Sequence, residues 1–313
     1  MATPKDDPMQ VFDRRAVRRH RDRAAAVFAE HRFLIDEVAE RLTDRLDDVR
    51  RLFPRALDLG ARDGALARCL TGRGGIETLV QCDVSQDLVA RADGLRVVAD
   101  EEALPFAPDS FDLVLSSLSL HWVNDLPGAL VQIRQALKPD GLFLAALLGG
   151  DTLTELRQSL ADAEIAMEGG LSPRVSPFAD VRDVGGLMQR AGFALPVVDA
   201  DIITVSYADP LRLMADLRGM GEANAVLERR RTIMRRETLM EAAARYRQRF
   251  GGEDGRIPAT FQVIYLTGWA PHASQPQAAR RGSATARLAE ALDAQEIAAG
   301  EKAVPMPAPA DRR

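Results

Sequence analysis

One stretch near the start of the chain constrains its fold more than any other. Residues 56–59 form a short apolar run around Asp58, and Gly60 and Gly64 follow it. Residues 65–70 are compatible with the first turn of a helix. Open α/β sheets present backbone groups to small charged ligands where a buried strand turns sharply into a helix. Glycine suits the positive φ and the close approach that such a turn needs. The stretch therefore predicts a ligand site at the end of a strand.

Apolar and amphipathic segments alternate regularly after this stretch. Strands are expected at 55–59, 78–82, 95–99, 111–120 and 142–148, and helices at 64–70, 86–92 and about 126–137. Ser85 and either Asn124 or Asp125 are expected to cap two of these helices, and residues 138–141 are expected to form a turn. This βαβ rhythm predicts a parallel sheet with helices on both faces.

The pattern changes beyond Gly150. Thr152 and Glu155 have the spacing of a capping box for a helix that extends to about Met167. Further helices are expected at 12–30, 33–49, 181–191 and within 209–250, and further strands at 194–205 and 258–269. We therefore expect an N-terminal helical cap (1–54), an α/β domain (55–269) with a helical insertion at about 209–250, and a disordered tail (270–313) with one helix at 284–299.

The composition is that of a protein with a large apolar core. Its 313 residues suit one large α/β domain with additions or two small domains, and 46% hydrophobic residues are enough to fill the core. A net charge of −5 gives no reason to expect nucleic-acid binding. Cys69 and Cys82 fall in expected buried elements, which indicates reduced thiols in a cytosol-like compartment. No apolar run suits a membrane span or a secretory signal, so we expect a cytoplasmic protein.

The glycine pattern separates two classes of nucleotide ligand. A dinucleotide-binding loop needs the sequence G-x-G-x-x-G, and Arg62 stands here in place of its second glycine. The looser alternative is the loop that binds S-adenosylmethionine (SAM), in which an acidic strand end precedes the glycines. SAM carries no phosphate and offers an ammonium, a carboxylate, a ribose, an adenine and a sulfonium. The pattern therefore favours SAM over NAD.

Acidic residues at three successive strand ends support this prediction. Asp58 can attract the ammonium, and Asp83 can accept hydrogen bonds from both ribose hydroxyls. Asp100, with Glu101 beside it, can accept from the adenine amino group. The residues predicted to hold the cofactor are Asp58, Gly60, Ala61, Gly64, Asp83, Val84, Asp100, Glu101, Ser116 and Ser117. The alternative is that the carboxylates only cap helices.

Longer motifs give a resemblance to known families. The segments 99–106 (ADEEALPF), 111–114 (FDLV) and 137–141 (LKPDG) resemble class I SAM-dependent methyltransferases of the methyltransferase-11 type. A narrower resemblance, over about residues 12–285, is to the arginine-hydroxylase family of respiratory complex I assembly factors. It is carried by 116–127 (SSLSLHWVNDLP), 149–157 (GGDTLTELR), 168–178 (EGGLSPRVSPF), 219–224 (GMGEAN), 258–262 (PATFQ) and 281–285 (RGSAT).

The resemblance implies a Rossmann-like fold with a seven-stranded, mostly parallel sheet, and SAM as the cofactor. It also implies an enzyme that hydroxylates an arginine in an iron–sulfur subunit of complex I. Membrane contact is then expected to be at most peripheral, at the inner membrane. The related malonyl-carrier-protein methyltransferases leave methyl transfer to a small-molecule or carrier-protein carboxylate as the alternative. An assembly chaperone that binds SAM only structurally is a third interpretation.

Arg62 departs from the loop of most methyltransferases, where glycine is common at this position. Its side chain could crowd the methionyl carboxylate of SAM or form an ion pair with it. Either outcome affects the affinity and pose of SAM, whereas the fold does not depend on this residue.

Candidate reactive residues follow the fourth and fifth expected strands, at the edge where open α/β sheets place substrates. His121 is predicted to act as a general base or to hold a substrate, with Trp122 and Asn124 beside it as substrate-binding residues. Asp151 is predicted to hold a cationic substrate arginine. The alternatives are that His121 binds a neighbouring loop, that Trp122 packs under a helix, and that Asp151 caps a helix.

Glu222 and Asn224 lie in the insertion and could face the pocket, although exposed polar loop residues are the favoured interpretation. The arginine cluster at 229–236 could dock an acidic partner or an anionic membrane face, although a solvated helix is the favoured interpretation.

No metal site is expected. A non-haem iron hydroxylase needs two histidines and a carboxylate, and the one suitable spacing, His20 to Asp22, lies in an arginine-rich helix. The expectation of hydroxylation therefore rests on the resemblance.

Overall fold

The computed structural model describes residues 10–276, 288–295 and 300. The chain forms one compact unit, Met1–Ala273, and a second unit, Ser274–Arg313, whose described helix is α11 (Leu288–Ala291). Half of the helix expected at 284–299, and much of the tail expected to be disordered, lie outside the described residues, as does the motif at 281–285.

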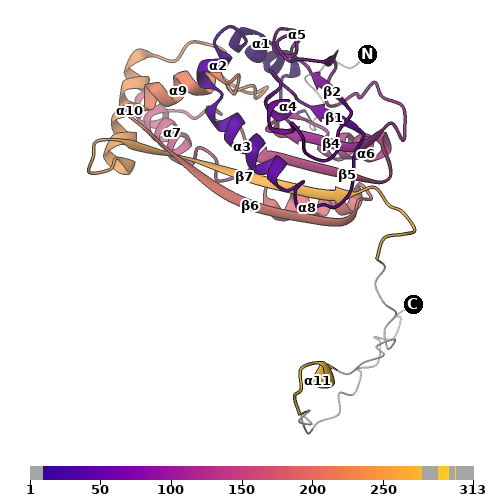
Figure 1. Ribbon diagram of the computed structural model, residues 1–313. Helices are drawn as coiled ribbons and strands as arrows, with labels where there is room; N and C mark the ends of the chain where they lie inside the picture. The colour runs from indigo at the N-terminus through magenta and orange to yellow at the C-terminus, as the bar shows by residue number, and fades with distance from the viewer. Residues whose placement is uncertain (1–9, 277–287, 296–299, 301–313) are drawn as a thin grey trace, which may run out of the picture. The chain divides into compact units, whose positions relative to one another are not determined.

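A seven-stranded sheet forms the centre of the first unit, in the order β3-β2-β1-β4-β5-β7-β6 (Figure 1). The strands are β1 (Arg55–Leu59), β2 (Thr78–Asp83), β3 (Leu95–Val98), β4 (Phe111–Ser117), β5 (Leu137–Leu148), β6 (Ala194–Tyr207) and β7 (Ile257–Trp269). The first five strands pair in parallel, whereas β7 runs antiparallel to both β5 and β6. The predicted Rossmann-like, mostly parallel sheet is confirmed.

Three helices precede β1, and the other helices of this unit lie in the connections between the strands. In chain order, the helices are α1 (Arg14–Ala24), α2 (Phe28–His31), α3 (Phe33–Asp44), α4 (Ala65–Cys69), α5 (Gln86–Val89), the 3₁₀ turn η1 (Leu120–Trp122), α6 (Leu126–Ala136), α7 (Thr154–Glu168), α8 (Val181–Arg190), α9 (Pro210–Gly219) and α10 (Arg236–Phe250). The helix expected at 12–30 is therefore two helices. The insertion contains α9 and α10, but residues 220–235 between them are not helical.

The alternation of side chains along the central strands builds a core on each face of the sheet. Leu113 and Leu115 of β4 pack on the face covered by α3, α7 and α10, with Val38 and Leu42 of α3 among the contacts. Val114, between them, belongs to the opposite core, to which α6 and α8 contribute. Both cores are needed because parallel sheets bury both faces.

Two of the expected helix caps are confirmed and one is wrong. The Ser85 side chain accepts from the backbone of α5, and Asp125 caps α6. The capping box at Thr152 and Glu155 is wrong, because Leu153 adopts a left-handed φ of 54° and the helix begins after it. The Thr152 hydroxyl instead donates to the Gln262 carbonyl of β7 (3.1 Å), and Glu155 accepts from Thr260.

Two strand boundaries also differ from expectation. The fourth strand ends at Ser117 rather than at residue 120, because Leu118 has a φ of 48° and the chain then turns into η1. The turn expected at 138–141 belongs to β5, since Leu137 already pairs with Phe111 before an irregularity in the ladder. The change at β4 matters for function because it directs residues 118–122 across the carboxyl edge of the sheet.

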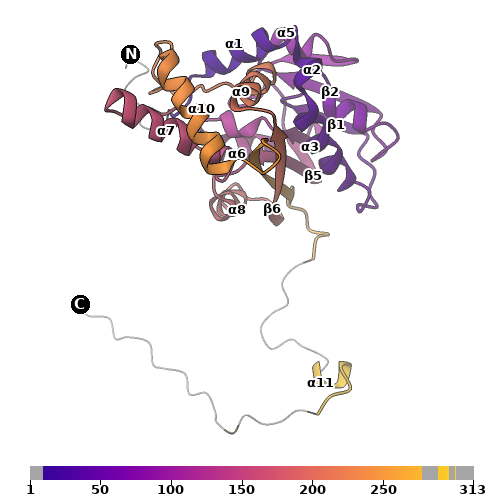
Figure 2. The same ribbon diagram turned by 90° about the vertical axis from the view of Figure 1, so that its left-hand side faces the viewer.

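Two groups of helices surround this edge. Helices α1 and α5 lie side by side, and α7, α9 and α10 lie together where the insertion leaves the sheet (Figures 1 and 2). Arg21 of α1 reaches the end of β2, and Glu222, which follows α9, contacts residues that follow β1 and β4.

Candidate functional site

The glycine loop after β1 is closely packed. Gly60 and Gly64 have φ values of 82° and 84°, which favour glycine. The backbone N–H groups of Gly60 and Ala61 both donate to the Cys82 carbonyl of β2 (2.7 and 2.9 Å). A Cβ atom on Gly60 would lie 2.2 Å from the Cβ of Ser119. The loop thus lies directly against the segment that follows β4.

The carboxyl group of Asp58 is buried and lacks a hydrogen-bond partner among the described residues. Its side chain is fully buried at the end of β1, and neither oxygen has a hydrogen-bond partner among the described residues. Burial, reinforced by the nearby charge of Asp83, raises the pKa of Asp58 well above its usual range. A buried charge without a partner is unfavourable, so this carboxyl is suited to receive an ammonium.

Asp83 lies at the end of β2, beside the buried Val84. It accepts backbone N–H bonds from Ser85 (2.8 Å) and Arg62 (3.0 Å). The guanidinium Nη1 of Arg21 lies 3.2 Å from both of its carboxylate oxygens. The carboxylate predicted to bind ribose hydroxyls is therefore engaged by an arginine of α1.

The same helix engages the acids that follow β3. Arg21 is fully buried and also donates to Glu101 (3.1 Å) and to the Ser119 hydroxyl (2.8 Å). Arg14 pairs with both Asp100 and Glu101. Although burial raises the pKa of Glu101, the two guanidinium groups lower it to about 2. Helix α1 thus covers the acidic strand ends.

Sequence reasoning missed Arg14, Arg21 and Ser119. A signal was present, because Val17, Arg21 and Ala24 share one helical face and all three are buried. An arginine within an apolar stripe needs a buried acid, and the strand ends supply the acids.

The two serines late in β4 lie where they were predicted. The Ser116 hydroxyl donates to the Leu59 carbonyl (2.7 Å) and so joins β4 to the end of β1. The Ser117 hydroxyl is buried and has no partner in the described part of the chain. Ser117 is therefore the more available of the two for a further hydrogen bond.

Arg62 points toward the insertion. It has a φ of 52°, and its side chain is buried. Its guanidinium donates to the carbonyls of Leu118 (2.7 Å) and Met220 (3.1 Å) and pairs with the Glu222 carboxylate. The glycine loop and the insertion are thereby joined through one buried ion pair.

Glu222 is the centre of a polar cluster, and its expected description as an exposed loop residue is wrong. Its second carboxylate oxygen accepts from His121 Nε2 (3.0 Å) and from the Trp122 indole N–H (2.8 Å). Burial raises the pKa of Glu222, but Arg62 and then His121 lower it below its usual range, so the group is ionised. Glu222 therefore serves as the shared acceptor for three side chains.

This cluster also determines the state of His121. Burial lowers the pKa of His121, more than the neighbouring Glu222 raises it, so the ring is neutral near pH 7. A carboxylate only accepts, so Nε2 carries the proton and Nδ1 is the acceptor nitrogen. Nδ1 is buried and has no partner among the described residues. His121 thus has an acceptor nitrogen available.

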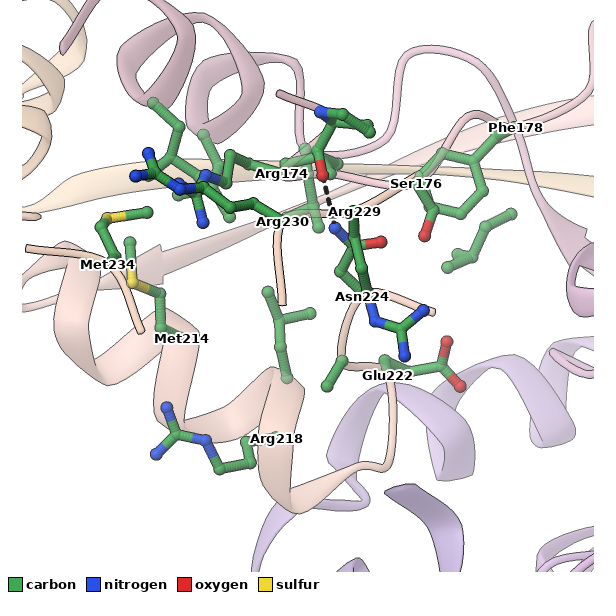
Figure 3. Close-up of a pocket in the computed structure, with 18 of the residues that line it drawn as sticks. Arg174, Ser176, Phe178, Met214, Arg218, Glu222, Asn224, Arg229, Arg230 and Met234 are labelled. Atoms are coloured by element: carbon green, nitrogen blue, oxygen red, sulfur yellow. Dashed lines mark hydrogen bonds between the residues drawn. The ribbon is translucent and has the colours of Figure 1, made fainter. Parts of the chain in front are cut away.

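A pocket of about 320 Å³ adjoins this cluster. Figure 3 shows Met214 and Met234 on one side of it and Glu222 with Asn224 on the other. Most of its wall is apolar and comes from Trp122, Leu148, Leu153, Leu156, Leu160, Val175, Phe178, Met214, Leu217 and Met234. Arg174, Arg218, Arg229 and Arg230 also line it. The Phe178 ring, which lines the pocket, lies 5.8 Å from the ring of the buried His121, which is not itself among the lining residues.

Two of the predicted reactive residues lie elsewhere. Asp151 is exposed, accepts from the Gln262 amide (3.1 Å) and is not among the residues that line the pocket. The Asn124 side chain accepts from the backbone N–H groups of Val11 and Phe12 (2.8 and 2.7 Å). Asn124 therefore holds the segment that leads into α1.

The spacing considered for iron does not bring its residues together. His20 Nδ1 lies 3.0 Å from the Ala223 carbonyl, whereas Asp22 accepts from the Ser85 hydroxyl (2.6 Å). Across residues 10–276, 288–295 and 300, no three His, Cys, Asp or Glu side chains form a set that could hold a metal ion.

Comparison with known proteins identifies the family. The family model described as a methyltransferase domain matches residues 57–145. The Danio rerio protein named "Arginine-hydroxylase NDUFAF5, mitochondrial" is 46% identical over 293 residues, which cover 90% of this chain and 89% of that protein. The chain belongs to the NDUFAF5 family. A malonyl-[acyl-carrier protein] O-methyltransferase from Halorhodospira halophila is 40% identical over 268 residues, covering 83% of this chain and 89% of that enzyme.

Solved structures agree on the fold. The YcgJ protein from Bacillus subtilis has a TM-score of 0.52 at 15% identity, over 74% of this chain and 98% of that one. Phosphoethanolamine N-methyltransferase 2 from Haemonchus contortus, solved with SAM, has a TM-score of 0.52 at 15% identity, over 82% of this chain and 60% of that one. Together with the matching methyltransferase domain and the two named relatives, this makes the chain an enzyme of the SAM-dependent methyltransferase superfamily, as predicted.

Membership of this superfamily confirms the predicted cofactor, and the donor set of the site fits it. The unpartnered carboxyl of Asp58 suits the ammonium of SAM, and Asp83 has the two oxygens that a ribose diol needs. Both oxygens of Asp83 contact Arg21 in the conformation described here.

Proposed function

We propose that this enzyme binds SAM at the carboxyl ends of β1 to β4 and hydroxylates an arginine in an iron–sulfur subunit of complex I during assembly. The observation that carries the proposal is the 46% identity, over 90% of this chain, to a protein named as an arginine hydroxylase. The pocket beside His121 supports it, because its apolar walls suit the methylene stem of an arginine.

The residues of the chain have distinct proposed roles. Asp58 holds the ammonium of SAM, Asp83 holds the ribose, and Asp100 with Glu101 holds the adenine. Gly60, Ala61, Gly64, Val84, Ser116 and Ser117 complete the cofactor site. Bound SAM supplies a sulfonium with an electrophilic methyl group. Helix α1 moves to admit SAM, because its Arg14 and Arg21 pair with Asp100 and Asp83, which are proposed to hold the cofactor.

His121 is proposed to receive a guanidinium N–H of the substrate at Nδ1. Glu222 keeps the proton on Nε2 and so keeps Nδ1 in the acceptor state. Trp122 forms part of the pocket wall. We propose this cluster, rather than the exposed Asp151, as the centre of the reaction.

Methyl transfer to a carboxylate is the second candidate function. Two observations favour it: the 40% identity to a malonyl-[acyl-carrier protein] O-methyltransferase, and the four arginines that line the pocket. A carboxylate substrate would be attracted by these cations.

We further propose that the enzyme acts in the cytoplasm, with at most peripheral contact to the inner membrane. Two animal relatives carry the word mitochondrial in their names. None of the helices in the described residues is long and apolar enough to cross a membrane.

Mass analysis of the complex I iron–sulfur subunit from a deletion strain tests the proposal. We expect one arginine to lose the mass of a single oxygen atom, and the wild-type gene to restore it. His121→Ala should not restore it. An unchanged arginine mass would contradict the hydroxylase function. Transfer of labelled methyl from SAM to malonyl-carrier protein by the purified enzyme would support the alternative instead.

A further inference from the structure

A wide groove lies beside the pocket, between the start of α1 and the chain that follows α9. Its volume is about 1010 Å³. Six arginines line it: Arg14, Arg15, Arg19, Arg229, Arg230 and Arg231. The acidic residues in its lining are Asp13 and Glu102. We call this surface the basic groove.

Some of these arginines are already paired, but an excess of positive charge remains. Arg229 pairs with Asp13 (3.1 Å), and Arg230 pairs with Glu168. Arg15 and Arg231 are exposed and form no ion pair within the described part of the chain. Arg19 is 59% exposed and lies 3.9 Å from the already paired Asp13. Three cations are therefore available to a ligand.

The walls of the groove are held by backbone contacts rather than by long side chains alone. Phe12 and Val226 form an antiparallel bridge. The Leu227 N–H donates to the Val11 carbonyl (2.8 Å), and the Asp13 N–H donates to the Ala225 carbonyl (2.8 Å). The interpretation of the 229–236 cluster as a solvated helix is wrong, since α10 begins only at Arg236. The cations are thus presented on a preformed surface.

The basic groove and the pocket are neighbours. Arg229 and Arg230 line both of them. Asn124, which was predicted to bind substrate, lines the groove, and Trp122, which precedes it by two residues, lines the pocket. A chain that follows the groove therefore arrives at the pocket beside His121.

We propose that the basic groove binds an acidic segment of the protein substrate and so guides the residue to be modified into the pocket. This proposal rests on the part of the proposed function that makes the substrate a protein. A recessed groove suits an extended chain better than a flat membrane surface. It offers no exposed aromatic side chain for stacking on nucleic-acid bases, since Phe12 is buried.

Binding of a short fluorescent glutamate-rich peptide to the full chain tests this assignment. Fluorescence anisotropy should give saturable binding that weakens as ionic strength rises, because exposed charges are screened by salt. The variant R15E/R19E/R231E should lose affinity by about tenfold or more. The matched control R50E/R91E/R190E reverses three exposed arginines outside the groove and should bind like the wild type.

Two results would overturn the proposal. One is equal binding of the peptide by the two triple variants. The other is no binding of the peptide by the wild type, with or without binding of anionic phosphatidylglycerol vesicles. If R15E/R19E/R231E does not fold, the neutral variant R15Q/R19Q/R231Q replaces it. Its melting temperature is first checked against that of the wild type. The measurement needs neither SAM nor turnover, so it remains interpretable even if the iron–sulfur subunit carries no modified arginine.

Discussion

Arg21 and Asp83 form a fully buried ion pair in which one guanidinium nitrogen lies 3.2 Å from both carboxylate oxygens. The pair joins α1 to the end of β2, where a ribose is expected to bind. In the proposed cofactor site, Arg21 and SAM therefore compete for the same carboxylate.

Arg21→Met should separate the stability of the free protein from its affinity for SAM. Loss of the buried cation leaves Asp83 and Glu101 undercompensated, which is expected to lower the free energy of unfolding by about 3 kcal/mol. SAM should nevertheless bind about tenfold more tightly, because no arginine has to withdraw. Calorimetric titration and urea unfolding measure the two effects.

Arg18→Met is the matched control for this experiment, since Arg18 lies on α1 but is half exposed and pairs with Asp22. It should change neither quantity strongly. Weaker SAM binding by Arg21→Met would mean that Arg21 belongs to the cofactor site and does not compete with SAM.

Asp58→Asn should remove a dependence of stability on pH. The folded-state pKa of Asp58 lies above its usual value of 3.8, so its effect on the free energy of unfolding becomes less favourable as pH rises above that value. The variant should gain stability relative to the wild type by up to about 1.4 kcal/mol per pH unit in the affected range.

Urea unfolding of both proteins from about pH 4 to about pH 7 measures this difference. If the free energies of unfolding of the wild type and the variant changed with pH in the same way, the raised pKa of Asp58 would be contradicted. The same variant should lose SAM binding, because an amide does not replace the carboxylate beside an ammonium.

Arg62 and Glu222 should be strongly coupled in a double-mutant cycle. Glu222→Gln leaves a buried guanidinium without its counter-charge and is expected to cost about 3–5 kcal/mol. Adding Arg62→Met should recover part of this loss, with a coupling of at least about 1 kcal/mol. Additive losses in chemical denaturation would show that the two groups act independently.

His121→Gln should reduce turnover by about a hundredfold to ten-thousandfold while SAM affinity stays within twofold. Glutamine can still donate to Glu222, but it has no ring nitrogen to accept a proton. Single-turnover assays of modification of the protein substrate, with parallel calorimetry, measure both quantities. A parallel loss of SAM binding would mean that the substitution disturbs the cofactor site instead.

Local patterns predicted the fold well because each element carries its own periodicity and caps. Ser85 and Asp125 both cap the helices expected after them. The capping box at Thr152 failed because a tertiary contact with β7 competes for its hydroxyl, and spacing alone cannot reveal that contact.

Of the candidate site, only the acidic residues at the ends of apolar strands could be predicted from the sequence. Asp58 and Asp83 were found from the end of an apolar run, which is a local signal. Arg21 meets Asp83 across 62 residues and Arg62 meets Glu222 across 160 residues, so only the folded chain brings these pairs together. Glu222 was misjudged because a polar residue in a glycine-flanked loop is usually exposed.

The ion pair between Arg62 in the glycine loop and Glu222 in the insertion limits which segments of this enzyme can be exchanged with those of a related methyltransferase. A chimaera that took its first βα turn from a methyltransferase with glycine at position 62 would leave Glu222 without its main cation. A graft of the insertion alone onto such an enzyme would create the same imbalance. The two segments must be exchanged together, so substrate recognition and cofactor recognition are expected to diverge in concert rather than by independent loop replacement.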